Sequence, residues 1–331
     1  MSVWPTMLTP FNAEGDIDVD GLGRLVEWYL DRGVDGLFAV CLSSEMFHLR
    51  PEERRTIARL VVETVAGRVP VAAGALAGGG STPMAGDGST PMAGDGSTAL
   101  AGDGSTATAG DGSTAADTPA LADEVRALRD AGAAVVVLLT NRLAAPEESD
   151  DVWRSRAERL LDTVPDIPLG LYECPSPYRR SVSTDLLAWC ARTGRFVFFK
   201  DTCCDVARLR ERLDVLRGTA LRLYNANTET LLASLHAGAA GFSGIMANFH
   251  PELYVWLTRH WSDEPERAER LHRWLTQADA IGSVGYPGSA KRLLRYRGLD
   301  LPPYCRCMAV DESTDGLRDL NERLRPPFGV D

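Results

Sequence analysis

The chain has 331 residues, of which 44% are hydrophobic and 24% charged, so it can bury a large core as one large α/β domain or two smaller ones. A formal net charge of −11 argues against nucleic acid and anionic membranes as partners, because both favour basic patches. No apolar run reaches the roughly 18 residues of a membrane helix, and the N-terminal "MSVWPTMLTPFNAEGD" lacks the pattern of an export signal. We therefore expect a cytoplasmic protein. Seven cysteines are an odd number in a long chain without an export signal, which argues against a disulfide framework, and they lack the spacing of a zinc site.

Eight short apolar segments, alternating with amphipathic ones, are expected to be strands. They cover residues 3–8, 36–41, 69–74, 134–139, 167–172, 196–200, 221–225 and 239–244. Nearly continuous apolar strands separated by helices are typical of a parallel sheet covered by helices. Eight such units predict an α/β fold of the (β/α)8 or TIM barrel type over residues 1–262. The remaining pattern is helical only, which predicts a C-terminal helical extension at 263–331.

Two helices have recognisable ends in the sequence. Apolar residues in 22–30 recur at helical spacing after the cap candidate Asp18, and Gly33 closes the turn that follows. The next helix is expected to begin at Pro51 and to end at Gly67, since proline favours the first turn of a helix and glycine its end.

One segment interrupts the alternation of strands and helices. From residue 81 to 112 the octapeptides "STPMAGDG", "STPMAGDG", "STALAGDG" and "STATAGDG" follow one another, and a fifth copy begins just before the next helix. Without 81–112 the third strand would lead directly into that helix, so this segment is an insertion. Its composition favours a solvated, poorly ordered tandem duplication. Its place after the third strand, at the end of the barrel where active sites are built, leaves a lid role open.

The sixth strand candidate ends in a lysine. The chain has 35 lysines and arginines, and only Lys200 and Lys291 are lysines. A lysine amine is a nucleophile when it is unprotonated, and apolar surroundings favour that form, whereas arginine keeps its proton. Lys200 is therefore a candidate for Schiff-base formation with a carbonyl substrate; the alternative is a lysine that extends to solvent or pairs with Asp201. Lys291 lies among arginines in a helical pattern, and we expect a structural role.

A tyrosine ends the fifth strand candidate, which neighbours the sixth in a barrel. The phenol of Tyr172 is suitable for moving protons to and from a substrate bound at Lys200. Packing is the alternative role for a tyrosine at the end of a strand.

Five segments, in order along the chain, resemble the dihydrodipicolinate synthase / N-acetylneuraminate lyase family of Schiff-base aldolases. They are "TPFNAEGDIDVDGL", "SSEMFHLRPEER", "LYECP", "FFKD" and "GFSGIMAN". The resemblance covers the whole chain apart from the insertion, and the spacing of 28 between Tyr172 and Lys200 matches the family. It implies a (β/α)8 barrel with a C-terminal helical extension, assembled as a homo-oligomer, a tetramer or a dimer. It also implies a 2-oxo acid such as pyruvate as substrate, and no metal or organic cofactor.

The resemblance also assigns roles to individual residues. Lys200 is the Schiff-base lysine and Tyr172 the proton-transferring phenol. Ser43 and Ser44 are expected to hold the substrate carboxylate. Ser243 and Gly244 fall on the segment that lines the keto-acid pocket, with a tight glycine turn as the alternative.

Four positions depart from the family pattern. Leu42 stands where the family has a hydroxyl that relays protons, and Arg142 and Leu143 stand where synthases have a tyrosine pair. Pro177 replaces the arginine that binds the carboxylate of the second substrate in true dihydrodipicolinate synthases. The half of the site that selects the second substrate is therefore expected to differ from theirs.

Arg142 is expected to recognise an anionic group on the second substrate, because a guanidinium binds a carboxylate with two parallel hydrogen bonds. The alternative is a surface arginine paired with Glu147 or Glu148.

Together these residues predict a Schiff-base-forming aldolase or lyase that uses a 2-oxo acid and an aldehyde, and that makes or breaks a carbon–carbon bond through a lysine enamine. One alternative is a sugar-acid dehydratase that uses the same imine to expel water. Another is a non-catalytic keto-acid-binding barrel, which the missing relay hydroxyl would fit. The presence of both Lys200 and Tyr172 favours catalysis.

Excision of residues 81–112 should leave a folded protein, because it rejoins an ordinary strand-to-helix connection. Each doubling of loop length costs only ~0.6 kcal/mol, so the melting temperature should change by no more than a few degrees. A thermal melt of the deletion variant beside the full chain measures this. A variant that does not fold would contradict the interpretation as an insertion, whereas a folded variant without activity would favour the lid.

Overall fold

The computed structural model describes residues 1–77, 118–310 and 322–326, so the octapeptide segment at 81–112 lies outside the described residues. Eight parallel strands alternate with helices, as the sequence predicts. The strands are β1 (Ser2–Val3), β2 (Leu37–Val40), β3 (Val71–Ala75), β4 (Val135–Leu139), β5 (Leu169–Tyr172), β6 (Phe196–Asp201), β7 (Arg222–Asn225) and β8 (Gly241–Phe242).

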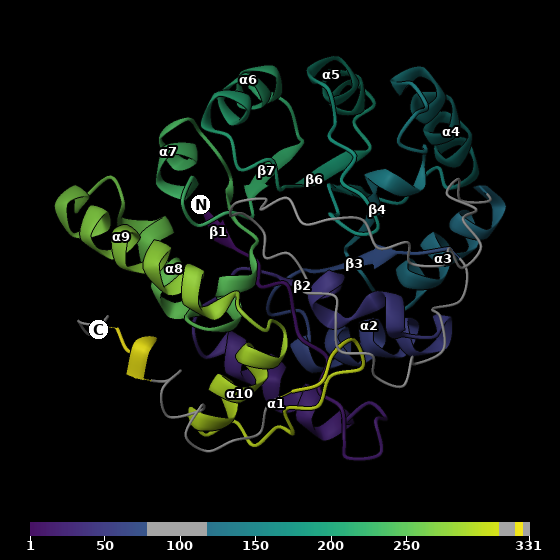
Figure 1. The fold of residues 1–331 in the computed structure, drawn as a ribbon. Coiled ribbons are helices and arrows are strands. Elements are labelled where there is room, and N and C mark those ends of the chain that lie inside the picture. Colours follow the sequence, from purple (N-terminus) through teal and green to yellow (C-terminus); the bar gives the residue numbers. More distant parts are fainter. Residues whose placement is uncertain (78–117, 311–321, 327–331) are drawn as a thin grey trace, which may run out of the picture.

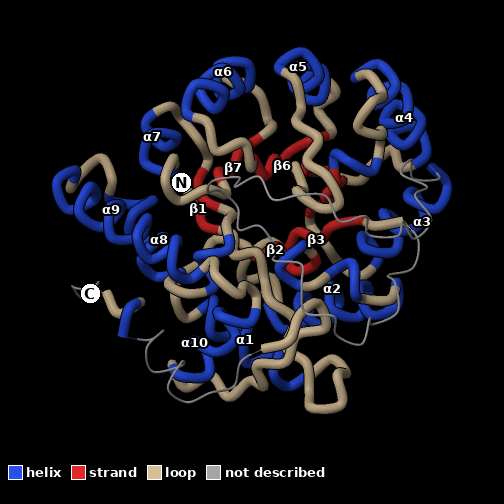
Figure 2. Tube along the Cα trace, in the orientation of Figure 1, coloured by secondary structure: helices blue, strands red, loops and turns tan. Residues whose placement is uncertain are grey.

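The strands form one sheet in the order β1-β8-β7-β6-β5-β4-β3-β2. The two ends of this order meet at a parallel bridge between Thr6 and Phe38, where the Met7 N–H also donates to the Phe38 carbonyl at 2.9 Å. The sheet therefore closes on itself, and Figure 2 shows the strands inside a ring of helices. The predicted (β/α)8 barrel is confirmed.

The helices of the ring follow the strands in sequence. They are α1 (Val19–Leu30), α2 (Pro51–Val65), α3 (Thr118–Asp130), α4 (Asp150–Thr163), α5 (Thr184–Arg192), α6 (Val206–Leu216), α7 (Leu231–His236) and α8 (Pro251–His260). Four short 3-10 turns, η1 (Leu42–Ser44), η2 (Met46–His48), η3 (Thr140–Arg142) and η4 (Ile245–Asn248), lie after β2, β4 and β8. These turns are therefore at the carboxyl ends of the strands.

Local sequence explains the ends of the first two helices. The Asp18 side chain caps α1 by accepting a hydrogen bond from the Gly21 N–H at 2.8 Å, as expected. The second helix begins at Pro51 but ends two residues earlier than expected, because Ala66 already adopts the left-handed conformation at φ 49°. Gly67 continues that conformation at φ 78° instead of starting it.

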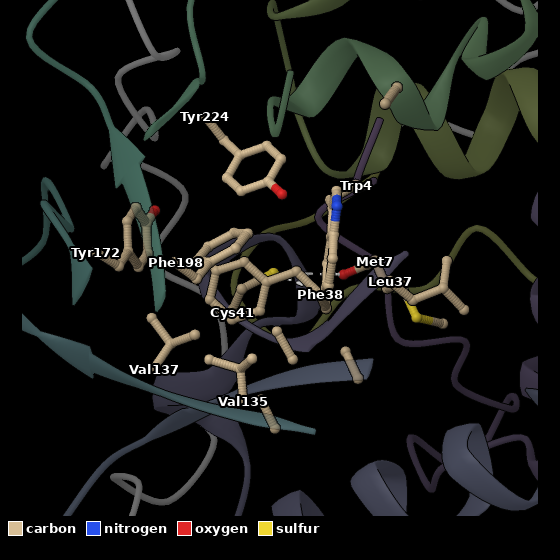
Figure 3. Packing of buried hydrophobic residues seen from close by; sticks show 14 of the residues in the cluster. Trp4, Met7, Leu37, Phe38, Cys41, Val135, Val137, Tyr172, Phe198 and Tyr224 are labelled. Atoms are coloured by element: carbon tan, nitrogen blue, oxygen red, sulfur yellow. Dashed lines mark hydrogen bonds between the residues drawn. The ribbon is translucent and has the colours of Figure 1, made fainter. Parts of the chain in front are cut away.

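Aromatic side chains fill the barrel interior (Figure 3). The Phe198 ring stacks on Tyr224 with centroids 4.6 Å apart and lies 5.3 Å from Trp4. Phe38 approaches both Phe198 and Tyr172 edge-on at 5.9 Å. The barrel is thus a packed core and not a pore, so the space for chemistry lies at the ends of the strands.

Two further helices, α9 (Pro265–Gly282) and α10 (Gly288–Tyr296), lie outside the ring beside α8 and α1 (Figure 1). The described residues after 300 form no helix up to 310, so the expected helical character of 263–331 does not extend over that stretch. The chain there returns to the turn after β2: the N–H groups of Arg306 and Cys307 donate to Glu45 at 2.6 and 2.9 Å. Across the described residues, none of the helices combines the length and apolar character needed to cross a membrane.

The second lysine fastens α10 to the same glutamate. The Lys291 Nζ donates to Glu45 Oε1 and to the Tyr304 carbonyl, each at 2.7 Å, and its side chain is about 1% exposed. Loss of one member of such a buried pair leaves the other charge uncompensated. Lys291 therefore lies in a structural ion pair that joins residues 246 positions apart.

Candidate active site

Tyr172 and Lys200 are neighbours across the ladder between β5 and β6. Successive side chains of a strand point to opposite faces, so Lys200 lies on the same side of β6 as Phe198, whose ring is in the barrel interior. The Lys200 Nζ lies 4.3 Å from the centre of the Tyr172 ring, and both residues are 1% exposed. The structure thus brings the predicted amine and phenol together at the carboxyl end of the barrel.

Ser43 and Ser44 lie in the 3-10 turn after β2, and both are buried. The Ser43 hydroxyl donates to the Thr6 hydroxyl at 3.0 Å, which connects this turn to the segment after β1. The Ser44 hydroxyl donates to the Cys41 carbonyl at 2.7 Å and accepts from the Cys41 N–H at 2.6 Å. Ser44 therefore stabilises its own turn, whereas Ser43 reaches across to the segment after β1. Thr6 did not stand out in the sequence, because its partner is 37 residues away.

Ser243 and Gly244 follow β8. The Ser243 hydroxyl is completely buried and has no hydrogen-bond partner among the described residues. A buried hydroxyl without a partner is rare in native proteins. At Gly244 a Cβ atom would lie 2.3 Å from the Ala226 carbonyl oxygen, so close packing alone requires glycine there. The tight-turn interpretation therefore suffices for Gly244, while Ser243 retains an unsatisfied hydroxyl.

Arg142 ends the 3-10 turn after β4 and is half-buried. Its guanidinium carbon lies 5.2 Å from the centre of the Phe47 ring, and its Nε is buried without a hydrogen-bond partner among the described residues. Burial lowers the pKa of Arg142 from its usual value. Glu148, one of the two partners considered for it, is instead bound by Arg156, with Nη2 and Oε1 2.7 Å apart. Arg142 is thus partly desolvated between loops of the barrel mouth.

Side-chain hydrogen bonds that the sequence did not reveal hold the loop after β5. The Asn141 amide nitrogen donates to the carbonyls of Cys174, Ser176 and Tyr178 at 3.0, 2.9 and 2.6 Å. Arg180 in the same loop donates to the Ala145 carbonyl at 2.7 Å. Every one of these acceptors is a backbone carbonyl, which leaves no trace in the sequence, so pattern reading could not find them.

Charged residues directly follow both Tyr172 and Lys200. Glu173 and Asp201 are fully buried, and Arg212 on α6 binds both of them. The alternation of side chains along a strand was the available signal, because it places these two carboxylates on the outer face of the barrel.

Comparisons with known proteins agree with this geometry. The model of the dihydrodipicolinate synthetase family matches residues 1–100 and 122–325. A 4-hydroxy-tetrahydrodipicolinate synthase of Gluconacetobacter diazotrophicus is 25% identical over 326 residues, which covers 96% of this chain and 94% of that protein. YagE of Escherichia coli K12, provisionally named a 2-dehydro-3-deoxy-D-gluconate aldolase, is 26% identical over 290 residues, 86% of this chain and 82% of that protein.

Solved structures give the same fold. The structure of YagE in complex with pyruvate matches with a TM-score of 0.78 at 22% identity, over 98% of both chains. Dihydrodipicolinate synthase from Thermotoga maritima matches with a TM-score of 0.77 at 19% identity, over 98% of this chain and 97% of the other.

The eight-stranded barrel with helices after it is the fold of the solved dihydrodipicolinate synthase structures. The family match then identifies the chain: it belongs to the dihydrodipicolinate synthetase family, and the resemblance seen in the sequence is confirmed.

Replacement of Ser243 by alanine should leave the melting temperature unchanged or raise it, because the variant removes a buried hydroxyl that lacks a partner among the described residues. Ser234 is a matched control, since its buried hydroxyl donates to the Leu231 carbonyl at 2.7 Å and accepts from Asn225 at 3.1 Å. Ser234→Ala should cost about 1–3 kcal/mol of unfolding free energy. Equal losses in thermal melts of the two variants would show that Ser243 is satisfied in solution.

Proposed function

We propose that the chain is a Schiff-base-forming aldolase or lyase that acts on pyruvate or a related 2-oxo acid through Lys200. The observation that carries the proposal is the buried contact of 4.3 Å between the Lys200 amine and the Tyr172 ring at the carboxyl end of the barrel. Membership of the dihydrodipicolinate synthetase family supports it, and so does the similarity to YagE, which is provisionally named an aldolase and whose solved structure holds pyruvate.

The reaction begins with attack of the unprotonated Lys200 amine on the keto carbon. Loss of water from the resulting carbinolamine gives a protonated imine, which withdraws electrons from the adjacent carbon. In the cleavage direction the bond to that carbon breaks, its electron pair forms an enamine, and the second product leaves as an aldehyde. Tyr172 transfers the protons that the carbinolamine and enamine steps require. In the condensation direction the enamine attacks the aldehyde.

The other predicted residues bind the substrate in this scheme. Ser43, with its neighbour Ser44, lies in the turn that is to receive the carboxylate, and the unsatisfied hydroxyl of Ser243 lies in the turn after β8. Arg142 receives an anionic group of the second substrate, which would supply the hydrogen-bond partner that its buried Nε lacks among the described residues. The scheme needs neither a metal nor an organic cofactor. The homo-oligomer implied by the resemblance stays a prediction.

Pyruvate with sodium borohydride should attach a reduced adduct irreversibly to the protein, and peptide mapping should place it on the fragment that contains Lys200. Lys200→Arg keeps the charge but cannot form the imine, so it should fold and show neither adduct nor turnover. Lys291→Arg is the matched control, and it should still form the adduct. Its melting temperature should be lower, because the larger arginine must replace a lysine side chain that is only about 1% exposed.

An adduct or turnover in Lys200→Arg would refute the proposed mechanism. Product analysis with a panel of aldehydes and sugar acids separates an aldolase from a dehydratase, because only the second releases water from an intact carbon chain. An adduct without turnover on either panel would favour the non-catalytic barrel.

Arg142→Met should selectively weaken the binding of second substrates that carry an acidic group. A hydrogen bond to a charged group contributes about 1.5–3 kcal/mol, so KM for partners with a carboxylate or phosphate should rise roughly tenfold to hundredfold, with little change for neutral aldehydes. Steady-state kinetics with paired charged and neutral aldehydes measure the difference. Equal changes for both kinds of partner would leave Arg142 a structural residue.

A further inference from the structure

Three fully buried charges lie directly behind the proposed reactive pair. Glu173 and Asp201 are 0% exposed and Arg212 is 1% exposed. Arg212 Nη2 and Glu173 Oε1 are 2.6 Å apart, Nη1 and Oε2 are 3.1 Å apart, and Nη1 also binds the Asp201 carboxylate. We call these three residues the outer ion triad.

The triad connects the two strand ends that carry the chemistry. Glu173 follows Tyr172 at the end of β5, and Asp201 follows Lys200 at the end of β6. Since neighbouring residues of a strand face opposite sides, the reactive side chains point into the barrel while both carboxylates point toward α6. Arg212 therefore connects the two strands on the outer side of the barrel, through the carboxylates that directly follow Tyr172 and Lys200.

One backbone hydrogen bond just beyond the paired residues is long. The Glu173 N–H reaches the Lys200 carbonyl at 3.4 Å, which is longer than the usual 2.7–3.2 Å of such bonds. Side chains complete the connection. The Thr202 hydroxyl donates to the Glu173 carbonyl at 2.8 Å, and Arg212 adds its bonds to both carboxylates.

The composition of the triad is costly for stability alone. It holds two carboxyl groups and one guanidinium, all of them at most 1% exposed. Burial, together with the Asp201 carboxylate, raises the pKa of Glu173, whereas the two carboxylates raise the pKa of Arg212 in spite of its burial. Apolar residues of similar volume are often at least as stabilising as a buried ion cluster. A buried ion cluster is therefore weak evidence for a role in stability.

We propose that Arg212 is a positioning residue, which fixes the Tyr172 phenol against the Lys200 amine by binding the carboxylates that follow them in the chain. This role rests on the Schiff-base function proposed above. A displacement of reacting groups by about 1 Å can cost a hundredfold in rate, so a clamp one residue from the pair acts on the chemical steps. Binding of the substrate carboxylate takes place at the turn after β2 and should change little.

The test measures the rate of adduct formation on the full chain with pyruvate and sodium cyanoborohydride, over a range of pyruvate concentrations. Arg212→Met should lower the maximal rate at least about tenfold, while the pyruvate concentration for half the maximal rate stays within about twofold. Arg212→Lys keeps the charge without the planar fork, so it should restore part of the rate.

Arg195→Met is the matched control. Arg195 precedes the other end of β6, and its guanidinium binds the carbonyls of Val164 and Ile167, in the segment before β5. It thus joins the same two strands at their opposite ends. This variant should lose stability and keep the maximal rate. Melting temperatures of all variants are measured in parallel.

Equal maximal rates in Arg212→Met and Arg195→Met would overturn the positioning role. If Arg212→Met does not fold, Arg212→Lys and Glu173→Gln are compared with the same control, and unchanged maximal rates in both overturn it equally. A wild-type chain that forms no adduct overturns the function proposed for Lys200, and the positioning role with it. An adduct that forms at the same rate with and without Arg212 overturns the positioning role alone.

Discussion

The alternation of side chains along a β-strand is the constraint on which the site depends. Strands β5 and β6 each end in a polar pair, Tyr172 with Glu173 and Lys200 with Asp201. Because the two strands are parallel and in register, the inner members meet as a phenol and an amine, and the outer members meet at Arg212. A shift of either strand by one residue would exchange the two sets. The same ladder thus fixes the proposed chemistry inside the barrel and an ion cluster outside it.

Both lysines of the chain are buried to about 1% exposure, although arginine supplies nearly all of its positive charge. Lys291 binds Glu45 and a carbonyl, so the rarity of lysine does not by itself mark a reactive amine. The surroundings of Lys200, namely the Tyr172 ring and the end of a barrel strand, support the reactive role, and composition does not.

Features that depend on local pattern could be predicted from the sequence. The eight strands, the cap at Asp18 and the pairing of Tyr172 with Lys200 follow from periodicity, turn chemistry and barrel order. Contacts between distant residues could not. The bond between Ser43 and Thr6 and the ion pair between Lys291 and Glu45 require knowledge of which turns meet in space. The early end of α2 at Ala66 was missed because alanine seldom adopts the left-handed conformation.

Packing in the turn after β2 favours carboxylate binding over proton relay at the barrel mouth. Leu42, at the position of the family's relay hydroxyl, packs against the core, and the hydroxyl of Ser43 donates to Thr6. Glu45, which follows this turn, accepts hydrogen bonds from the Lys291 ammonium and from the Arg306 N–H, and these bonds hold the turn in place. A turn held in this way suits fixed binding of a carboxylate better than proton relay, which requires hydroxyls free to rotate between partners. In the proposed mechanism proton transfer therefore falls to Tyr172, and this raises the value of holding its strand end rigidly against that of Lys200.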